Sequence, residues 1–164
     1  MRILVFLAFL GLSGPLAAQV SNDPALDPTL DPTLDPALTK AIQAAQETLP
    51  IFLKHALIGE GGLQVSLPAG PNGAFEQIWV TPFRQRADGR YEGIVATDPQ
   101  FALGLAAGST VVFERADITD WSAVIAGRGY GYFSLRAVLH RLDPDKARVL
   151  NLFLAETPLP ASWR

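Results

Sequence analysis

The residues best suited to bind a ligand lie between Asp120 and Arg136. This segment combines aromatic rings and guanidinium groups with several glycines. Such side chains supply most of the binding energy at interfaces, through apolar area and planar charged hydrogen bonds. If the chain has a ligand surface, we expect it on Trp121, Arg128, Tyr130, Tyr132 and Arg136. The competing interpretation is structural: Trp121 plugs the core and Arg136 pairs with an internal carboxylate.

The stretch Arg128–Leu135 resembles the RNP1 segment of RNA-recognition domains, in which aromatic rings stack on bases beside a basic first residue. The charge of the chain opposes this interpretation. From Thr39 to Arg164 there are 12 basic and 12 acidic residues, so the positive footprint of a general nucleic-acid binder is missing. We therefore expect no nucleic-acid partner.

Catalytic chemistry has few candidate residues. There is no Cys, which excludes thiol nucleophiles, disulfides and thiolate metal sites. His55 and His140 have no readable partner, and Ser134 near His140 and Asp143 lacks the nucleophile elbow of a hydrolase. We predict no catalytic residue, no metal site and no cofactor. The rival hypothesis is a hydrolase that uses carboxylates such as Asp98, Asp117 and Asp120.

The first 18 residues are organised like a secretory signal peptide. Arg2 precedes an apolar run from Ile3 to Leu12, and a Gly-Pro pair is followed by Ala17 and Ala18. The run is shorter than the roughly 20 apolar residues of a membrane helix. We expect cleavage after Ala18, export to the bacterial periplasm or exterior, and no stable membrane insertion afterwards. An uncleaved anchor is the alternative.

Four copies of Asp-Pro-x-Leu follow, each beginning with one of Asp23, Asp27, Asp31 and Asp35. Each Pro fixes its own backbone angle and lacks a donor, so residues 19–35 are predicted to form an extended, semi-rigid linker. A partner-binding tail is the alternative. The last copy also predicts a helix start, because Asp35 suits an N-cap and Pro36 a first helical residue.

Residues 36–164 are predicted to be one globular α+β domain. Apolar residues at helical spacing predict a helix from about Pro36 to Leu57, kinked or interrupted near Thr48 because of Pro50. Alternating patterns and turn residues predict strands near 63–67, 75–83, 91–97 and 109–115. The expected sheet is antiparallel, has about four strands, and is strongly coiled or partly barrel-like. An N-terminal helix and C-terminal helices flank it.

Two helices are expected near the C-terminus. Ser134 can cap the first, although an edge strand over 132–138 fits this stretch equally well. Asp143 and Pro144 predict the start of the second helix, and Pro158 with Pro160 ends it.

Six sequence blocks extend over about residues 45 to 142: Thr48–Leu53, Glu76–Val80, Asp98-Pro99, Gly104-Leu105 with Gly108, Ile118–Trp121 and Gly129–Arg136. In order and spacing they resemble the YegJ-like domain of unknown function found in bacterial proteins. The chain departs from that pattern at Gln77, where His is common, at Ser109, where Asp usually follows the glycine, and at Ser122, where Met is common. The resemblance implies no reaction, cofactor or catalytic residue.

These features predict a small exported binding or interaction module without catalytic activity. Its partner would be a protein or a small molecule of the cell envelope. The alternatives are the carboxylate hydrolase and a structural envelope protein. A carboxylate pair about 5 to 10 Å apart in a cleft would favour glycoside hydrolysis, whereas dispersed carboxylates would favour binding.

Overall fold

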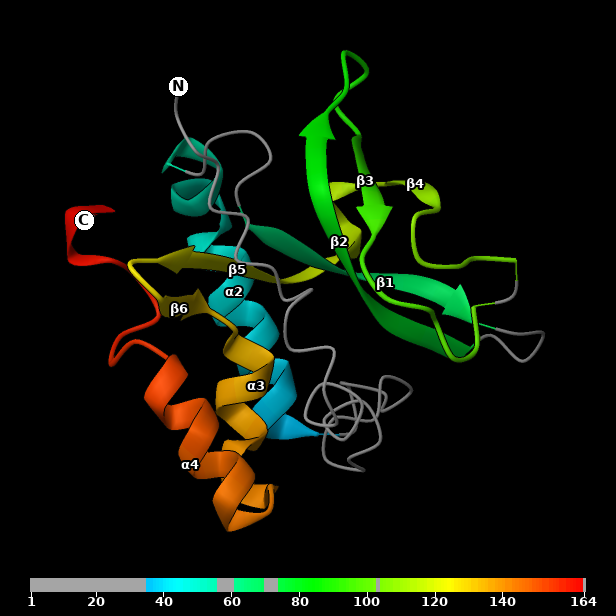
Figure 1. The fold of residues 1–164 in the computed structure, drawn as a ribbon. Coiled ribbons are helices and arrows are strands. Elements are labelled where there is room, and N and C mark those ends of the chain that lie inside the picture. The colour runs from blue at the N-terminus through cyan, green and yellow to red at the C-terminus, as the bar shows by residue number, and fades with distance from the viewer. Residues whose placement is uncertain (1–34, 56–60, 70–73, 103, 164) are drawn as a thin grey trace, which may run out of the picture.

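The computed structural model describes residues 35–55, 61–69, 74–102 and 104–163 (Figure 1). The predicted signal peptide (1–18) and all but the last residue of the predicted linker (19–35) therefore lie outside the described residues. The turn expected at Pro71-Asn72-Gly73 lies outside them as well. No helix among the described residues combines the length and apolar character needed to cross a membrane.

The N-terminal helix α2 (Pro36–His55) begins where the sequence predicts. The Asp35 carboxylate accepts the backbone N–H of Ala37 at 2.9 Å, which confirms the cap. Of the kink or interruption expected near Thr48, the interruption is wrong, because α2 is helical across Pro50. The packing of its apolar face offsets the hydrogen bond that Pro50 lacks. That face is formed by the buried residues Ala41, Ala45, Leu49 and Phe52.

One six-stranded antiparallel sheet runs through the domain, in the order β4-β3-β2-β1-β5-β6. The prediction of an α+β fold with an antiparallel sheet is confirmed. The predicted strand number and the coiled or barrel-like form are wrong, because the sheet is open and has two further strands. Its strands are β1 (Gly62–Ala69), β2 (Ala74–Gln85), β3 (Tyr91–Val95), β4 (Thr110–Phe113), β5 (Ile118–Ile125) and β6 (Arg128–Gly131).

Strands β5 and β6 lack the patterns that mark the other strands. The first six residues of β5 are all buried, and they include the polar residues Asp120 and Ser122, so hydrophobicity does not alternate along the strand. Strand β6 has four residues, two of which are glycine, a residue type that is depleted in strands. Pairing with β5, from Ser122 opposite Gly131 to Ile125 opposite Arg128, holds β6 in the sheet.

The C-terminal part contains helix α3 (Phe133–Val138), the 3₁₀ turn η4 (Leu139–Arg141), helix α4 (Pro144–Phe153) and the 3₁₀ turn η5 (Ala161–Trp163). The start of α4 is as predicted, since the Asp143 carboxylate accepts the backbone N–H of Asp145 at 3.0 Å. Ser134 does not cap α3. Tyr132 occupies the N-cap position without a side-chain capping bond, and the N–H groups of this helix start find their acceptor on another element.

The core lies where α2 and α3 pack against the sheet. Trp121 and Phe52 are both 0% exposed and stack with their ring centroids 4.8 Å apart. Alternation along β1 directs Leu63 and Val65 into this core and turns Gln64 and the following even-numbered residues to the opposite face. In Figure 1 the helices gather at one end of the sheet, and the β2–β3 hairpin projects at the other.

Candidate functional site

Of the five predicted ligand residues, Trp121 belongs to the core. Its side chain is 0% exposed. Its indole Nε1 donates to Thr48 Oγ1 on α2 at 3.0 Å, and its ring packs edge-on against Phe133. The structure therefore gives Trp121 a role in holding α2 and α3 on the sheet.

The guanidinium groups of Arg128 and Arg136 reach backbone carbonyls of the C-terminal segment. Arg128 donates to Leu152 O at 2.8 Å and to Leu154 O at 2.6 Å. Arg136 donates to Ala155 O at 2.9 Å, and also to the carbonyls of Gly131 at 2.8 Å and Gly129 at 3.1 Å. These bonds tie the chain after α4 to strand β6.

The two tyrosines of the predicted set lie in different environments. Tyr130 is partly buried and packs against the core. Tyr132 has a positive φ of 52°, and its ring lies 5.7 Å from that of Trp79 and 5.6 Å from that of Phe153. Burial raises the pKa of the Tyr132 phenol, against a hydrogen bond with the Ser122 side chain that lowers it. The structure thus brings Tyr132 together with Trp79, which lies in one of the family blocks but was not among the predicted ligand residues.

Beside this ring pair lies a row of uncharged polar side chains on the sheet face opposite α2. We call it the polar row; it consists of Ser66, Gln77, Thr119, Gln64 and Ser134. Gln77 Nε2 donates to Ser66 Oγ at 3.1 Å, and Thr119 Oγ1 lies 2.5 Å from Gln77 Oε1. Gln64 Oε1 lies 3.5 Å from both Thr119 Oγ1 and Ser134 Oγ. The row therefore crosses from β2 over β1 and β5 to α3.

Strand register explains why these residues meet. Ser66 lies opposite Gln77, and Gln64 lies opposite Trp79 on one side and opposite Asp120 on the other. The register between β1 and β5 shifts after Gln64, because Val65 lies opposite Ile118. This shift leaves Thr119 as an extra residue of β5, and such a bulge turns a side chain onto a face that regular alternation would not give it.

Ser134, the last member of the polar row, adjoins the buried carboxylate of Asp120, which is 0% exposed. This carboxylate accepts three backbone N–H groups, from Trp121 at 2.8 Å, Phe133 at 3.1 Å and Ser134 at 2.8 Å. Burial raises the pKa of Asp120 to about 6, and the N–H donors with the Ser134 side chain offset this only in part. Asp120 thus caps α3 and fastens it to β5.

The other carboxylates considered for hydrolysis also serve the backbone. Asp98 Oδ1 accepts the N–H of Ala107 at 2.8 Å, and Asp117 Oδ2 accepts that of Glu114 at 2.8 Å. Glu76, which the sequence patterns did not single out, is 2% exposed and accepts the N–H groups of residues 100, 101 and 102 at 2.6 to 2.9 Å. These carboxylates fix loops and turns.

The two histidines lie apart from the polar row. His55 stacks on Trp163 with ring centroids 5.5 Å apart, and His140 lies in η4. Within the part of the chain that the structure describes, no three His, Cys, Asp or Glu side chains are grouped so that they could hold a metal ion.

Most of the polar row was missed from sequence. Gln77 and Thr119 lie in two of the family blocks but were not considered as ligand residues, and no motif marked Gln64 or Ser66. The signal that could have found them is the alternation of residue types over 63–67 and 76–80. It places Gln64 with Ser66, and Gln77 with Trp79, on one face of each strand.

Residues 35–151 fit the sequence model of a family described as "Uncharacterized protein conserved in bacteria (DUF2314)". No curated protein and no solved structure matches the chain. The match spans the polar row and the ring pair completely.

Proposed function

The chain belongs to the DUF2314 family of bacterial proteins, and we propose that it is a small exported binding module whose polar row holds a carbohydrate. The finer YegJ-like assignment is part of this proposal and rests on the six sequence blocks. Export rests on the organisation of residues 1–18, and residues 19–35 would then act as the spacer between the cleavage site and the domain.

The observation that carries the proposal is the position of the polar row beside the Trp79–Tyr132 ring pair. Amide and hydroxyl groups exchange hydrogen bonds with sugar hydroxyls, and they carry no charge that would have to be neutralised. Aromatic rings offer a large, rigid apolar surface with few rotatable bonds. The combination fits a ligand that is polar, uncharged and flat on one side, as a pyranose ring is.

The positions of the carboxylates support binding over hydrolysis. Asp98, Asp117 and Asp120 each accept backbone N–H groups on different elements. A glycoside hydrolase needs two carboxyl groups that flank one bond. The three candidates serve local backbone structure, so the sheet face with uncharged side chains is the better site for a sugar.

Titration calorimetry of the purified chain with the linear tetramer of N-acetylglucosamine tests this function, with maltotetraose as the second saccharide. We expect at least one of them to bind, and Trp79→Ala or Gln77→Ala to weaken the affinity by about tenfold. Gln43→Ala is the matched control and should bind like the wild type. Gln43 is exposed on α2, and its side-chain amide bonds only to Glu47 among the described residues.

Three outcomes would contradict the proposal. The first is that neither saccharide binds, and the second is that the Trp79 and Gln77 variants bind as the wild type does. The third is that new reducing ends appear on incubation, which would show that the chain cleaves the saccharide. The last result would instead support the hydrolase alternative.

A further inference from the structure

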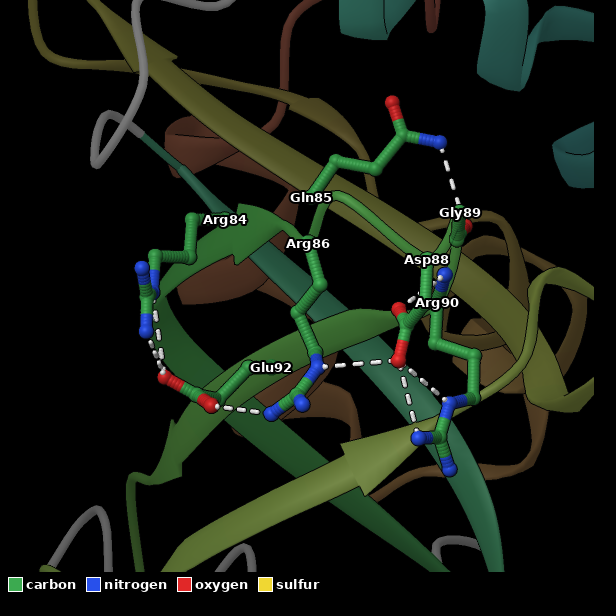
Figure 2. A network of polar contacts seen from close by, with 7 residues as sticks. All are labelled: Arg84, Gln85, Arg86, Asp88, Gly89, Arg90 and Glu92. Carbon is green, nitrogen blue, oxygen red and sulfur yellow. Dashed lines mark hydrogen bonds and ion pairs between the residues drawn. The ribbon is translucent and has the colours of Figure 1, made fainter.

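We propose that the tip of the β2–β3 hairpin is a binding site for a phosphomonoester group, formed by the guanidinium groups of Arg84 and Arg86. The site is separate from the polar row and does not depend on its function. Figure 2 shows the network, in which three arginines and two carboxylates alternate around the hairpin.

The carboxylates hold the guanidinium groups in fixed positions. Arg84 donates from Nε and Nη2 to Glu92 Oε1, at 3.0 and 2.6 Å. Arg86 donates from Nη1 to Glu92 Oε2 at 2.9 Å and from Nε to Asp88 Oδ2 at 3.4 Å. Because one carboxylate bridges both arginines, an oxyanion with three terminal oxygens can contact both as well.

Donors remain available in this network. None of the described residues accepts a hydrogen bond from Arg84 Nη1 or Arg86 Nη2. Arg90 donates to Asp88 through Nε and Nη2, at 3.1 and 2.8 Å. Its Nη1 likewise has no acceptor among the described residues. Each guanidinium thus keeps one terminal nitrogen for an incoming anion.

The network carries a net positive charge. Hydrogen bonds from Arg90 lower the pKa of Asp88, and those from Arg84 lower the pKa of Glu92. Both carboxylates therefore stay ionised at neutral pH, and three arginines against two carboxylates leave one positive charge. The domain from Thr39 onward is neutral, so this hairpin is a local concentration of positive charge.

The hairpin also offers space. A depression of about 320 Å³ beside the network is lined by Arg84, Arg86, Ala87 and Asp88. This volume exceeds that of a phosphate ion and lies at the lower end of the roughly 300 to 1,000 Å³ of small-molecule sites. The depression therefore has room for a phosphate group and for a small organic group attached to it.

The backbone of the tip is well defined. The N–H of Arg86 bonds to Arg90 O at 2.8 Å, and that of Gly89 bonds to Arg86 O at 3.0 Å. Gly89 supplies the positive φ of 87° that the turn requires, and Gln85 Nε2 donates to its carbonyl at 3.1 Å. The strands on both sides therefore present the arginines from a fixed frame.

The test uses the purified chain with two probes: glycerol 3-phosphate in solution, and phosphatidylcholine vesicles containing phosphatidic acid. Both probes carry a phosphomonoester, so the pair separates a soluble ligand from a lipid headgroup. The main variant is Arg84→Ala with Arg86→Ala. The exposed ion pairs that this variant removes contribute little to stability. An unchanged melting temperature verifies that the variant is folded. Arg148→Ala, which removes an exposed arginine of α4 paired with Asp145, is the control for the loss of an ion-paired arginine away from the hairpin.

We expect one or both probes to bind the wild type, the double alanine variant to bind about tenfold more weakly, and the control to be unchanged. Arg84→Lys with Arg86→Lys keeps the charge but removes the planar fork, so it should lose most of the affinity. The proposal is overturned if neither probe binds, if the double alanine variant binds like the wild type, or if the lysine variant retains full affinity.

Discussion

The carboxylate of Asp120 in β5 accepts the backbone N–H of Ser134 in α3 at 2.8 Å. It also accepts the N–H of Phe133 at 3.1 Å, so a buried strand residue caps a helix that starts 13 positions later along the chain. This contact fixes the angle at which α3 leaves β6. It also places Ser134, the last member of the polar row, beside Gln64.

Replacement of Asp120 by alanine should destabilise the domain. The N–H groups of Trp121, Phe133 and Ser134 would lose their acceptor in a buried site. We expect a loss of about 2 to 4 kcal/mol in the free energy of unfolding at pH 5. Urea unfolding followed by tryptophan fluorescence measures it. Asp117→Ala, which removes one acceptor from an exposed turn, should cost about 1 kcal/mol or less; equal losses for both variants would contradict the assignment of Asp120 as the buried cap.

Stability should also depend on pH through Asp120. Its folded pKa is about 6, above its ordinary value of 3.8, so between these values the folded state holds a proton that the unfolded chain releases. The free energy of unfolding should therefore fall as the pH rises from about 4 to 6, by an amount on the order of 3 kcal/mol. Asp120→Asn cannot titrate, and the difference between wild type and variant isolates this contribution.

Other carboxylates act in the opposite direction and at lower pH. A hydrogen bond from Arg141 lowers the pKa of Asp35 to about 2, and arginines lower those of Asp88 and Glu92. Their contribution to stability is lost as the pH falls below about 4.

The Asp120→Asn variant decides between these contributions. If the difference in free energy of unfolding between the wild type and this variant is constant between pH 4 and 6, the raised pKa of Asp120 is contradicted.

Arg136→Ala should loosen the chain that follows α4. The substitution removes the side-chain donors to the carbonyls of Gly129, Gly131 and Ala155. Gly129 O keeps the backbone N–H of Ala155, but the carbonyls of the buried residues Gly131 and Ala155 lose the donor that Arg136 provides. We expect a loss of about 2 kcal/mol in stability and faster proteolytic cleavage after residue 153. Arg148→Ala is the exposed control. An Arg136 variant that resists proteolysis as the wild type does would show that other contacts hold this segment.

Deletion of residues 21–34 should leave the stability of the domain nearly unchanged, with a loss below about 1 kcal/mol. The last Asp-Pro-x-Leu copy remains, and its Asp35 both caps α2 and pairs with Arg141. Asp35→Ala in the full chain should therefore lower the melting temperature more than the deletion does. The reverse order would show that the earlier copies contact the domain.

Local rules predicted those elements whose signals are local. The Asp-Pro pairs at 35–36 and 143–144 mark the starts of α2 and α4, and alternation marks β1. Strand β5 has no such signal, since buried polar residues interrupt its apolar pattern. The cap of α3 could not be inferred either, because the carboxylate that provides it lies 13 residues upstream of Phe133.

The candidate site depended even more on long-range structure. The sequence grouped Trp121 with Arg128 and Arg136 because they are close along the chain, but Trp121 faces the core and the arginines reach carbonyls after α4. Conversely, Gln77 and Thr119 are 42 positions apart and meet only because β1 lies between their strands. Sheet order and one bulge decide which side chains form the polar row.

The most direct test of the proposed function is a two-dimensional ¹H–¹⁵N NMR titration of the chain with the N-acetylglucosamine tetramer. The side-chain amide signals of Gln64 and Gln77 and the indole signal of Trp79 should shift together and saturate, while the indole of the buried Trp121 shifts little. Absence of any shift, or shifts confined to residues away from the polar row such as those of α4, would contradict carbohydrate binding on this sheet face.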